Sequence, residues 1–98
     1  ELDVQKRNLE NKIRQLRISL DILAEQIKVN EEVVSNFNEL LKAEIIKFNA
    51  GESSVLIVNI RENYYLDSKL KLLDLKKKYL INFAELEYYI GNSALAFE

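Results

Sequence analysis

The side chains of this chain that could do chemistry are almost entirely carboxylates, lysines, arginines and tyrosines. The 98 residues include 16 Asp and Glu, 14 Lys and Arg and 5 Tyr, but no His, Cys, Met or Trp. Histidine and cysteine supply most metal ligands, and histidine is the commonest general base, so their absence removes much of enzyme chemistry. A carboxylate-only site would need facing Asp and Glu pairs in a sheltered pocket, whereas the acids here are spread along the chain. We therefore expect no catalytic centre, no metal site and no cofactor.

The remaining reactive groups favour structural roles. The five tyrosines recur at helical spacing, which is typical of side chains that fill a coiled-coil seam or groove: Tyr64, Tyr65, Tyr79, Tyr88 and Tyr89. The basic run Lys76-Lys77-Lys78 is expected to be a solvated face. The net charge is −2, with acids and bases interleaved, which argues against nucleic acid as a partner.

The composition predicts long helices. The chain is 48% hydrophobic and 31% charged, with two glycines and no proline, which excludes a disordered tail. It has no apolar stretch of about 18 residues, so no helix is expected to span a bilayer. Two helices packed together have a thin core, so we expect the chain to associate with copies of itself or to belong to something larger.

A heptad pattern runs through the first half of the chain. Its seam positions are Leu2, Leu9, Leu16, Leu23 and Phe37 in one phase, and Ile13, Leu20, Ile27, Val34, Leu41 and Phe48 in the other. Three seam positions are polar, Lys6, Asn30 and Glu44, and Asn30 is expected to set the register. A second stripe lies beside the seam and is called the flank stripe below: Ile18, Ile22, Val29, Val33 and Leu40. A two-stranded coiled coil would leave this stripe in water, so we expect neighbours on more than one side.

The pattern is interrupted around Gly51. Glycine is the usual left-handed stop after a helix, and Ser53 or Ser54 can cap a new helix. The predicted fold is therefore an all-α antiparallel coiled-coil hairpin over residues 1–98, with arm one at about 1–49, a turn at about 50–53, arm two at about 54–90 and a tail at 91–98. Gly91 is expected to end the second arm. The β-branched run 55–58 could form a strand, but a lone strand would have no partner, so a helix is expected.

The second arm again carries two apolar stripes. One is called the outer strip below: Leu66, Leu70, Leu73, Leu80 and Ala84. The other comprises Val58, Tyr65, Leu72, Leu75, Tyr79, Leu86 and Tyr89. Since both arms have two apolar flanks, the isolated chain is expected to self-associate, with two hairpins forming a four-helix bundle.

The second half of the chain resembles the C-terminal repeat of the TolC family, the outer-membrane efflux proteins of double-membraned bacteria. The residues that carry this resemblance are Lys47, Phe48, Gly51, Ser53, Ser54, Val55-Leu56-Ile57-Val58, Tyr79-Leu80-Ile81-Asn82 and Gly91. The first arm is similar to the family only as a heptad helix. Asn59 and Arg61 stand where the family usually has leucine and alanine.

The resemblance also points to a gate. Phe48 and Ser53 stand at positions where the best-known member of the family has a tyrosine and an arginine. A different closing interaction, such as an apolar ring through Phe48, would be needed here.

The resemblance implies a hairpin at the periplasmic end of a helical tunnel, within a trimeric outer-membrane channel of a tripartite efflux or type I secretion system. Its turn would dock a periplasmic adaptor (membrane fusion) protein that connects to an inner-membrane transporter, and splaying of the helices would open the exit duct. The implied docking residues are Phe48, Asn49, Ala50, Gly51, Glu52, Ser53, Ser54, Val55 and Leu56.

Two other functions fit the heptads. The chain could be the α-hairpin of the adaptor itself, although the tip of that hairpin typically carries an arginine, and residues 39–46 contain none. It could also be a structural dimerisation coiled coil with no transport role, which would explain the heptads but not the motif spacing.

Overall fold

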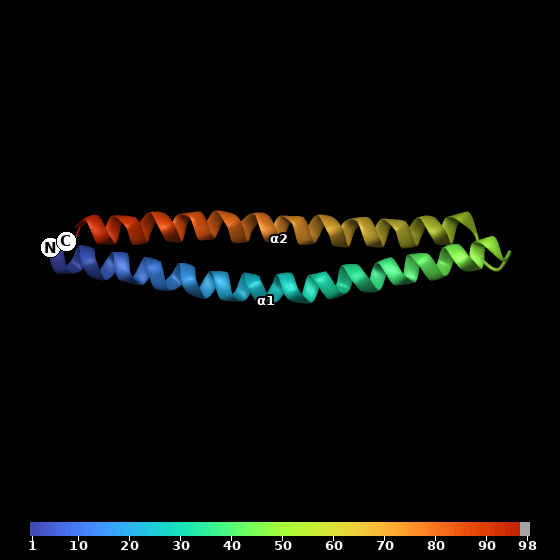
Figure 1. Ribbon diagram of the computed structural model, residues 1–98, viewed down its shortest axis with the longest axis horizontal. Helices are drawn as coiled ribbons and strands as arrows, with labels where there is room; N and C mark the ends of the chain where they lie inside the picture. The colour runs from blue at the N-terminus through green and yellow to red at the C-terminus, as the bar shows by residue number, and fades with distance from the viewer. Residues whose placement is uncertain (97–98) are drawn as a thin grey trace. The chain divides into compact units, whose positions relative to one another are not determined.

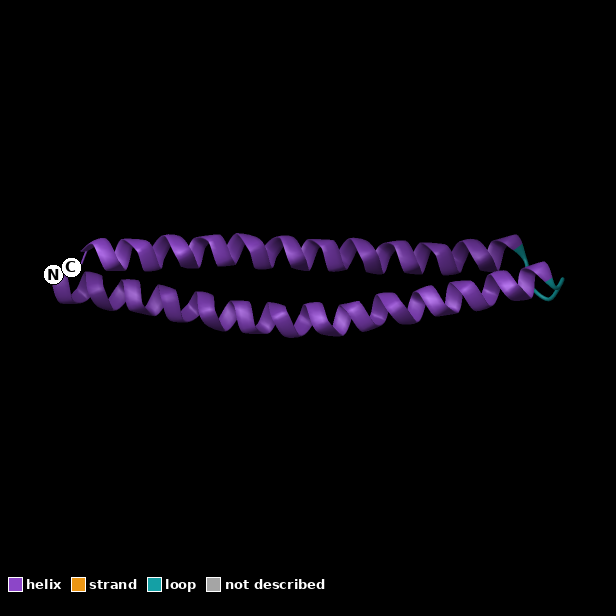
Figure 2. Cartoon of the chain, in the orientation of Figure 1, coloured by secondary structure: helices purple, strands orange, loops and turns teal. Residues whose placement is uncertain are grey.

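The computed structural model describes residues 1–96 and contains two long helices (Figures 1 and 2). Helix α1 spans Leu2–Asn49 and helix α2 spans Val55–Ala96, and no strand is present among residues 1–96. The chain forms an antiparallel hairpin, so the predicted all-α fold is confirmed. The run 55–58, for which a strand was considered, forms the first turn of α2.

The hairpin divides into two compact units. The first contains Glu1–Glu25 and the chain from Lys76 onward, and the second contains Gln26–Leu75 with the turn. In the first unit, Leu16, Leu20 and Leu86 form a buried cluster, against which Tyr79 and Tyr89 pack. Leu16, the least exposed of the buried leucines, still keeps 6% of its surface in contact with water. The core is therefore a single thin layer of side chains between the two helices.

The seam of α1 follows the predicted heptad. Its buried and half-buried apolar positions are Leu9, Ile13, Leu16, Leu20, Leu23, Ile27, Val34, Phe37 and Leu41. Two predicted seam residues, Leu2 and Phe48, are exposed instead. They lie at the two ends of the helix, and the chain across from Phe48 is the turn, which offers no helical surface to cover its ring.

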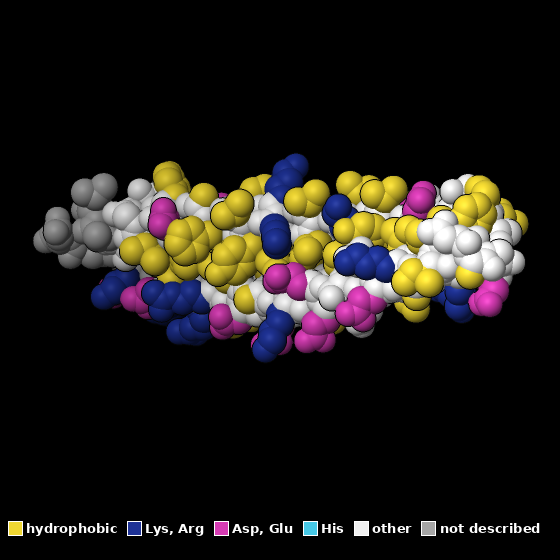
Figure 3. All heavy atoms as spheres, turned by 45° about the vertical axis from the view of Figure 1, so that its right-hand side comes forward, with side chains coloured by type: hydrophobic (Ala, Val, Ile, Leu, Met, Phe, Trp, Pro, Cys, Tyr) yellow, Lys and Arg dark blue, Asp and Glu magenta, His cyan; other side chains and the backbone are white. Residues whose placement is uncertain are grey.

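Helix α2 turns only one of its two apolar stripes inward. The buried and half-buried stripe is Val58, Tyr65, Leu72, Leu75, Tyr79, Leu86 and Tyr89. The leucines of the outer strip are all exposed, and Leu70 keeps 64% of its surface in water. Four members of the flank stripe of α1 are also exposed, whereas Val33 is half-buried. Figure 3 shows hydrophobic side chains at the surface among the charged ones.

The predicted end of the second arm at Gly91 is wrong. Helix α2 continues to Ala96, and Gly91 does not have a positive φ. Glycine inside a helix costs only about 0.5–1 kcal/mol relative to alanine, and no proline follows it to stop the helix. Asn92 and Ser93 are half-buried, so the helix keeps its inward face beyond the glycine. Of the predicted tail, residues 97–98 lie outside the described residues.

Candidate functional site

The candidate site is the turn between the two helices. Helix α1 ends in a Schellman motif, in which the Glu52 N–H donates to the Lys47 carbonyl at 2.8 Å and the Gly51 N–H donates to the Phe48 carbonyl at 3.0 Å. This geometry requires a left-handed residue, and Gly51 has φ 78°. The predicted glycine stop is therefore confirmed at Gly51, where an L-residue would be strained.

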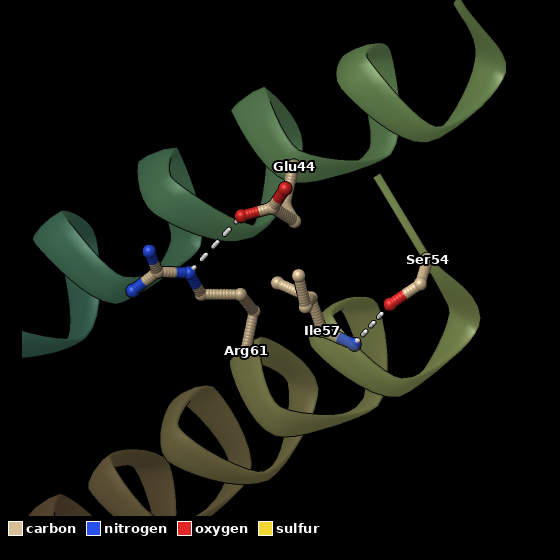
Figure 4. Close-up of polar contacts among 4 residues, drawn as sticks. All are labelled: Glu44, Ser54, Ile57 and Arg61. Atoms are coloured by element: carbon tan, nitrogen blue, oxygen red, sulfur yellow. Dashed lines mark hydrogen bonds and ion pairs between the residues drawn. The ribbon is translucent and has the colours of Figure 1, made fainter. Parts of the chain in front are cut away.

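Ser54 begins the second helix. Its hydroxyl oxygen accepts a hydrogen bond from the Ile57 N–H at 3.3 Å (Figure 4). Its carbonyl accepts from the Val58 N–H at 3.1 Å. Of the two serines considered as caps, Ser54 is the one that satisfies a free N–H of the first turn.

Beside the turn lies a polar cluster in the seam, which residue patterns did not identify as a unit. Glu44 of α1 is buried, with 7% of its surface exposed, and accepts from the Arg61 Nε–H of α2 at 3.4 Å (Figure 4). The sequence pattern nevertheless places both residues on the inward faces of their helices. Glu44 is a polar seam position, and Arg61 follows the same seven-residue spacing as the inward residues Leu75 and Tyr89.

The surroundings of Glu44 favour its charged form. The pKa of Glu44 is lowered, chiefly by the Ser53 hydroxyl, then by Arg61 and Lys47, while desolvation acts in the opposite direction. The Ser53 Oγ is buried and has no hydrogen bond of standard geometry to another described residue, but its O–H can rotate toward the carboxylate. The hydroxyls of Ser53 and Ser54 are therefore directed within the hairpin.

The remaining predicted docking residues lie at the surface. Phe48, Asn49, Ala50, Gly51, Glu52, Val55 and Leu56 are all exposed, and Leu56 keeps 69% of its surface in water. An added Cβ at Gly51 would meet no atom within 4 Å, so the backbone is open to a partner at this point. Ile46 adds a further exposed apolar side chain in the last turns of α1, on a different face from Phe48. The tip is thus a small apolar surface around an open glycine.

The two residues predicted to occupy gate positions face different environments. Phe48 is exposed, whereas Ser53 is half-buried next to Glu44.

Away from the turn, the helices are joined by a side-chain hydrogen bond and by a ring contact. In the first unit, the Asn82 Nδ2–H donates to the Ser19 hydroxyl at 2.8 Å. Asn30, expected to set the register, donates instead to the Gln26 carbonyl of its own helix at 2.8 Å. In the second unit, the rings of Phe37 and Tyr64 stack at 5.7 Å between centroids.

Neither a metal centre nor a membrane-crossing helix emerges from the described residues. Among residues 1–96, no group of three Asp or Glu side chains is placed to hold a metal ion. Within the same range, neither helix has an apolar run long enough to cross a membrane. Compared with family models, curated proteins and solved structures, the chain has no match in any of the three.

Proposed function

We propose that this chain is the periplasmic coiled-coil hairpin of a trimeric outer-membrane channel, in a tripartite efflux or type I secretion system. The observation that carries the proposal is the turn, where a left-handed glycine sits among exposed apolar residues. In this proposal the turn docks a periplasmic adaptor protein, which links the channel to an inner-membrane transporter. No enzymatic role is proposed.

The tip has the chemistry that packing of adaptor helices would use. Phe48, Val55 and Leu56 offer apolar side chains, and Gly51 allows close backbone approach. Helical knobs from a partner could enter this surface in coiled-coil fashion. Because the hydroxyls of Ser53 and Ser54 serve the hairpin itself, specificity would come from the apolar side chains with Asn49 and Glu52.

The surfaces of the helices suit a tunnel wall. Each helix of such a wall has one partner within its hairpin and another outside it. The flank stripe of α1 and the outer strip of α2 supply apolar surface for that second neighbour. Glu44 and Arg61 would hold the two helices together just above the tip, so that a splaying motion that opens the duct would have to act on this pair.

Site-directed crosslinking in cells tests the proposal. A cysteine replacing Leu56, in the channel protein that carries this hairpin, is expected to crosslink to the adaptor. A cysteine replacing the exposed Ser35, on the same hairpin but away from the turn, is the matched control and should not crosslink to it. Equal crosslinking at both positions, or none at Leu56 while the adaptor is present, would contradict docking at the turn.

A second experiment uses the glycine. Gly51→Val places a β-branched residue at a positive φ, which should distort the turn and reduce efflux. Unchanged efflux in cells that carry this variant at normal channel abundance would count against the proposal. It would favour a dimerisation hairpin, in which the tip has no partner.

A further inference from the structure

We infer that a second copy of this chain docks beside the first, with the outer strip of its α2 seated on the flank stripe of α1 and with both turns at the same end. The inference concerns the isolated chain in solution and does not depend on the channel role. It assigns an occupant to both apolar surfaces that the hairpin leaves exposed. It also specifies which charged residues face each other.

The exposed area of the chain matches such an arrangement. A compact monomeric protein of this mass exposes about 5,800 Å², whereas this chain of 11.5 kDa exposes 7445 Å². The excess is about 1,600 Å², and a specific interface takes about 800 Å² from each partner. The excess is thus large enough to supply two such interfaces on each chain.

The two patches lie on different faces of the hairpin. At 100° per residue, the outer strip lies roughly 150° around α2 from its inward stripe, and the flank stripe lies roughly 110° around α1 from the seam. A copy that uses its flank stripe to bind one neighbour therefore still offers its outer strip to another. Such a head-to-tail contact is heterologous, so the assembly either closes into a ring or continues to grow.

A row of exposed side chains at seven-residue spacing runs along one edge of each patch, and Ile18 belongs both to the flank stripe and to the row on α1. On α1 the row is Ile18, Glu25, Glu32, Glu39 and Ile46. On α2, read in the opposite direction, the row is Phe83, Lys76, Lys69, Glu62 and Val55. Antiparallel packing of α1 against the α2 of a second copy places these two rows along the same edge of the contact.

The register of the hairpin shows which members of the rows would meet. Three contacts between the helices join residues whose numbers add up to 101: Lys12 with Tyr89 and Ser19 with Asn82 in the first unit, and Phe37 with Tyr64 in the second. The long Glu44 and Arg61 side chains reach one helical turn further, with numbers that add up to 105. Two copies lying level with each other would follow the same rule. Glu25 would then face Lys76, and Glu32 would face Lys69.

The ends of the rows agree with this register. Ile18 would face Phe83 and Ile46 would face Val55, so that apolar side chains meet apolar ones. Only the position of Glu39 is unfavourable, because it would face Glu62. Four of the five facing pairs along the edge are therefore complementary.

Charge also disfavours the symmetric alternative. Two outer strips packed on each other about a two-fold axis perpendicular to the helices would run antiparallel, and antiparallel packing brings the same flank of both helices together. Lys69 and Lys76 of one copy would then lie against the same lysines of the other. The flank stripe, bordered by acids, is a better partner for a strip bordered by lysines.

Charge reversal and its compensation test this arrangement. Glu32→Lys and Lys69→Glu are each expected to weaken association about fivefold to tenfold, as an attractive exposed pair becomes a repulsive one. The double variant E32K/K69E should recover most of the loss, because each contact regains opposite charges. Glu31→Lys is the matched control, since Glu31 is exposed on the other side of α1 and should leave association unchanged.

Sedimentation velocity over a range of micromolar concentrations measures the association, with far-UV circular dichroism to verify that each variant keeps its helix content. Recovery in the double variant, with no effect of E31K, supports the inference. A wild-type chain that stays monomeric, a double variant as weak as the single ones, or an equal effect of E31K would overturn it.

Discussion

The same substitution, glycine to alanine, is expected to have opposite effects at the two glycines of this chain. Gly51 has φ 78°, and an L-residue in the left-handed region costs about 1–2 kcal/mol. Gly91 lies inside α2, where alanine is better than glycine by about 0.5–1 kcal/mol. An added Cβ would meet no atom within 4 Å at either position, so no steric clash contributes. The expected change in stability at each glycine therefore comes from the backbone conformation alone.

Urea unfolding followed by circular dichroism measures the difference. We expect Gly51→Ala to lower the free energy of unfolding by about 1–2 kcal/mol and Gly91→Ala to raise it by about 0.5–1 kcal/mol. Gly51→Asn should lie between Gly51→Ala and the wild type, since asparagine tolerates the left-handed region better. All chains must be compared at one protein concentration, because the proposed self-association would add to the apparent stability. If Gly51→Ala is as stable as the wild type, or if Gly91→Ala is destabilised, the assignment of these two conformations is refuted.

Two further predictions concern the seam. Because the pKa of Glu44 is lowered in the folded state, its contribution to stability is fully present above its unfolded pKa of about 4.3 and is lost as the pH falls through the folded value. Glu44→Gln should therefore show a smaller loss of stability on acidification than the wild type, and parallel curves of unfolding free energy against pH would contradict this. Leu20→Ala should lower the free energy of unfolding by about 2–3 kcal/mol, because Leu20 belongs to the buried cluster. Leu70→Ala should lower it by less than about 0.5 kcal/mol in the dilute monomer, because Leu70 is exposed. Equal costs in urea unfolding would mean that α2 turns its outer strip inward.

The hairpin could be predicted from local patterns because each of its determinants is local. The spacing of Leu9, Leu16 and Leu23 defines one face of a helix, whatever lies opposite. A glycine followed by serines and preceded by a long helical pattern predicts a stop and a new start, and Gly51 and Ser54 have these roles in the structure. The end at Gly91 was predicted wrongly by the same logic. A glycine stops a helix only where the chain turns, and here the inward face of α2 continues to Ser93.

The polar cluster at the turn could have been anticipated only in part. Glu44 was recognisable as a polar seam position. Which residue of α2 lies opposite it depends on the axial register between the two helices. That register follows from the length of the connection between Asn49 and Val55 and from the packing of the seam. Only the folded hairpin places Arg61 of α2 and the Ser53 hydroxyl next to the Glu44 carboxylate.

The sequence by itself determined that α2 has two apolar stripes, because periodicity depends only on residue type and helical pitch. It did not determine which stripe faces α1. By hydrophobicity alone, Leu66, Leu70 and Leu73 would be buried in preference to Tyr65 and Tyr79. The tertiary structure makes the opposite choice, because α2 is rotated about its axis so that Asn82 meets Ser19 and Arg61 meets Glu44. The leucines remain outside for this reason, and they are the surface that a neighbour would cover.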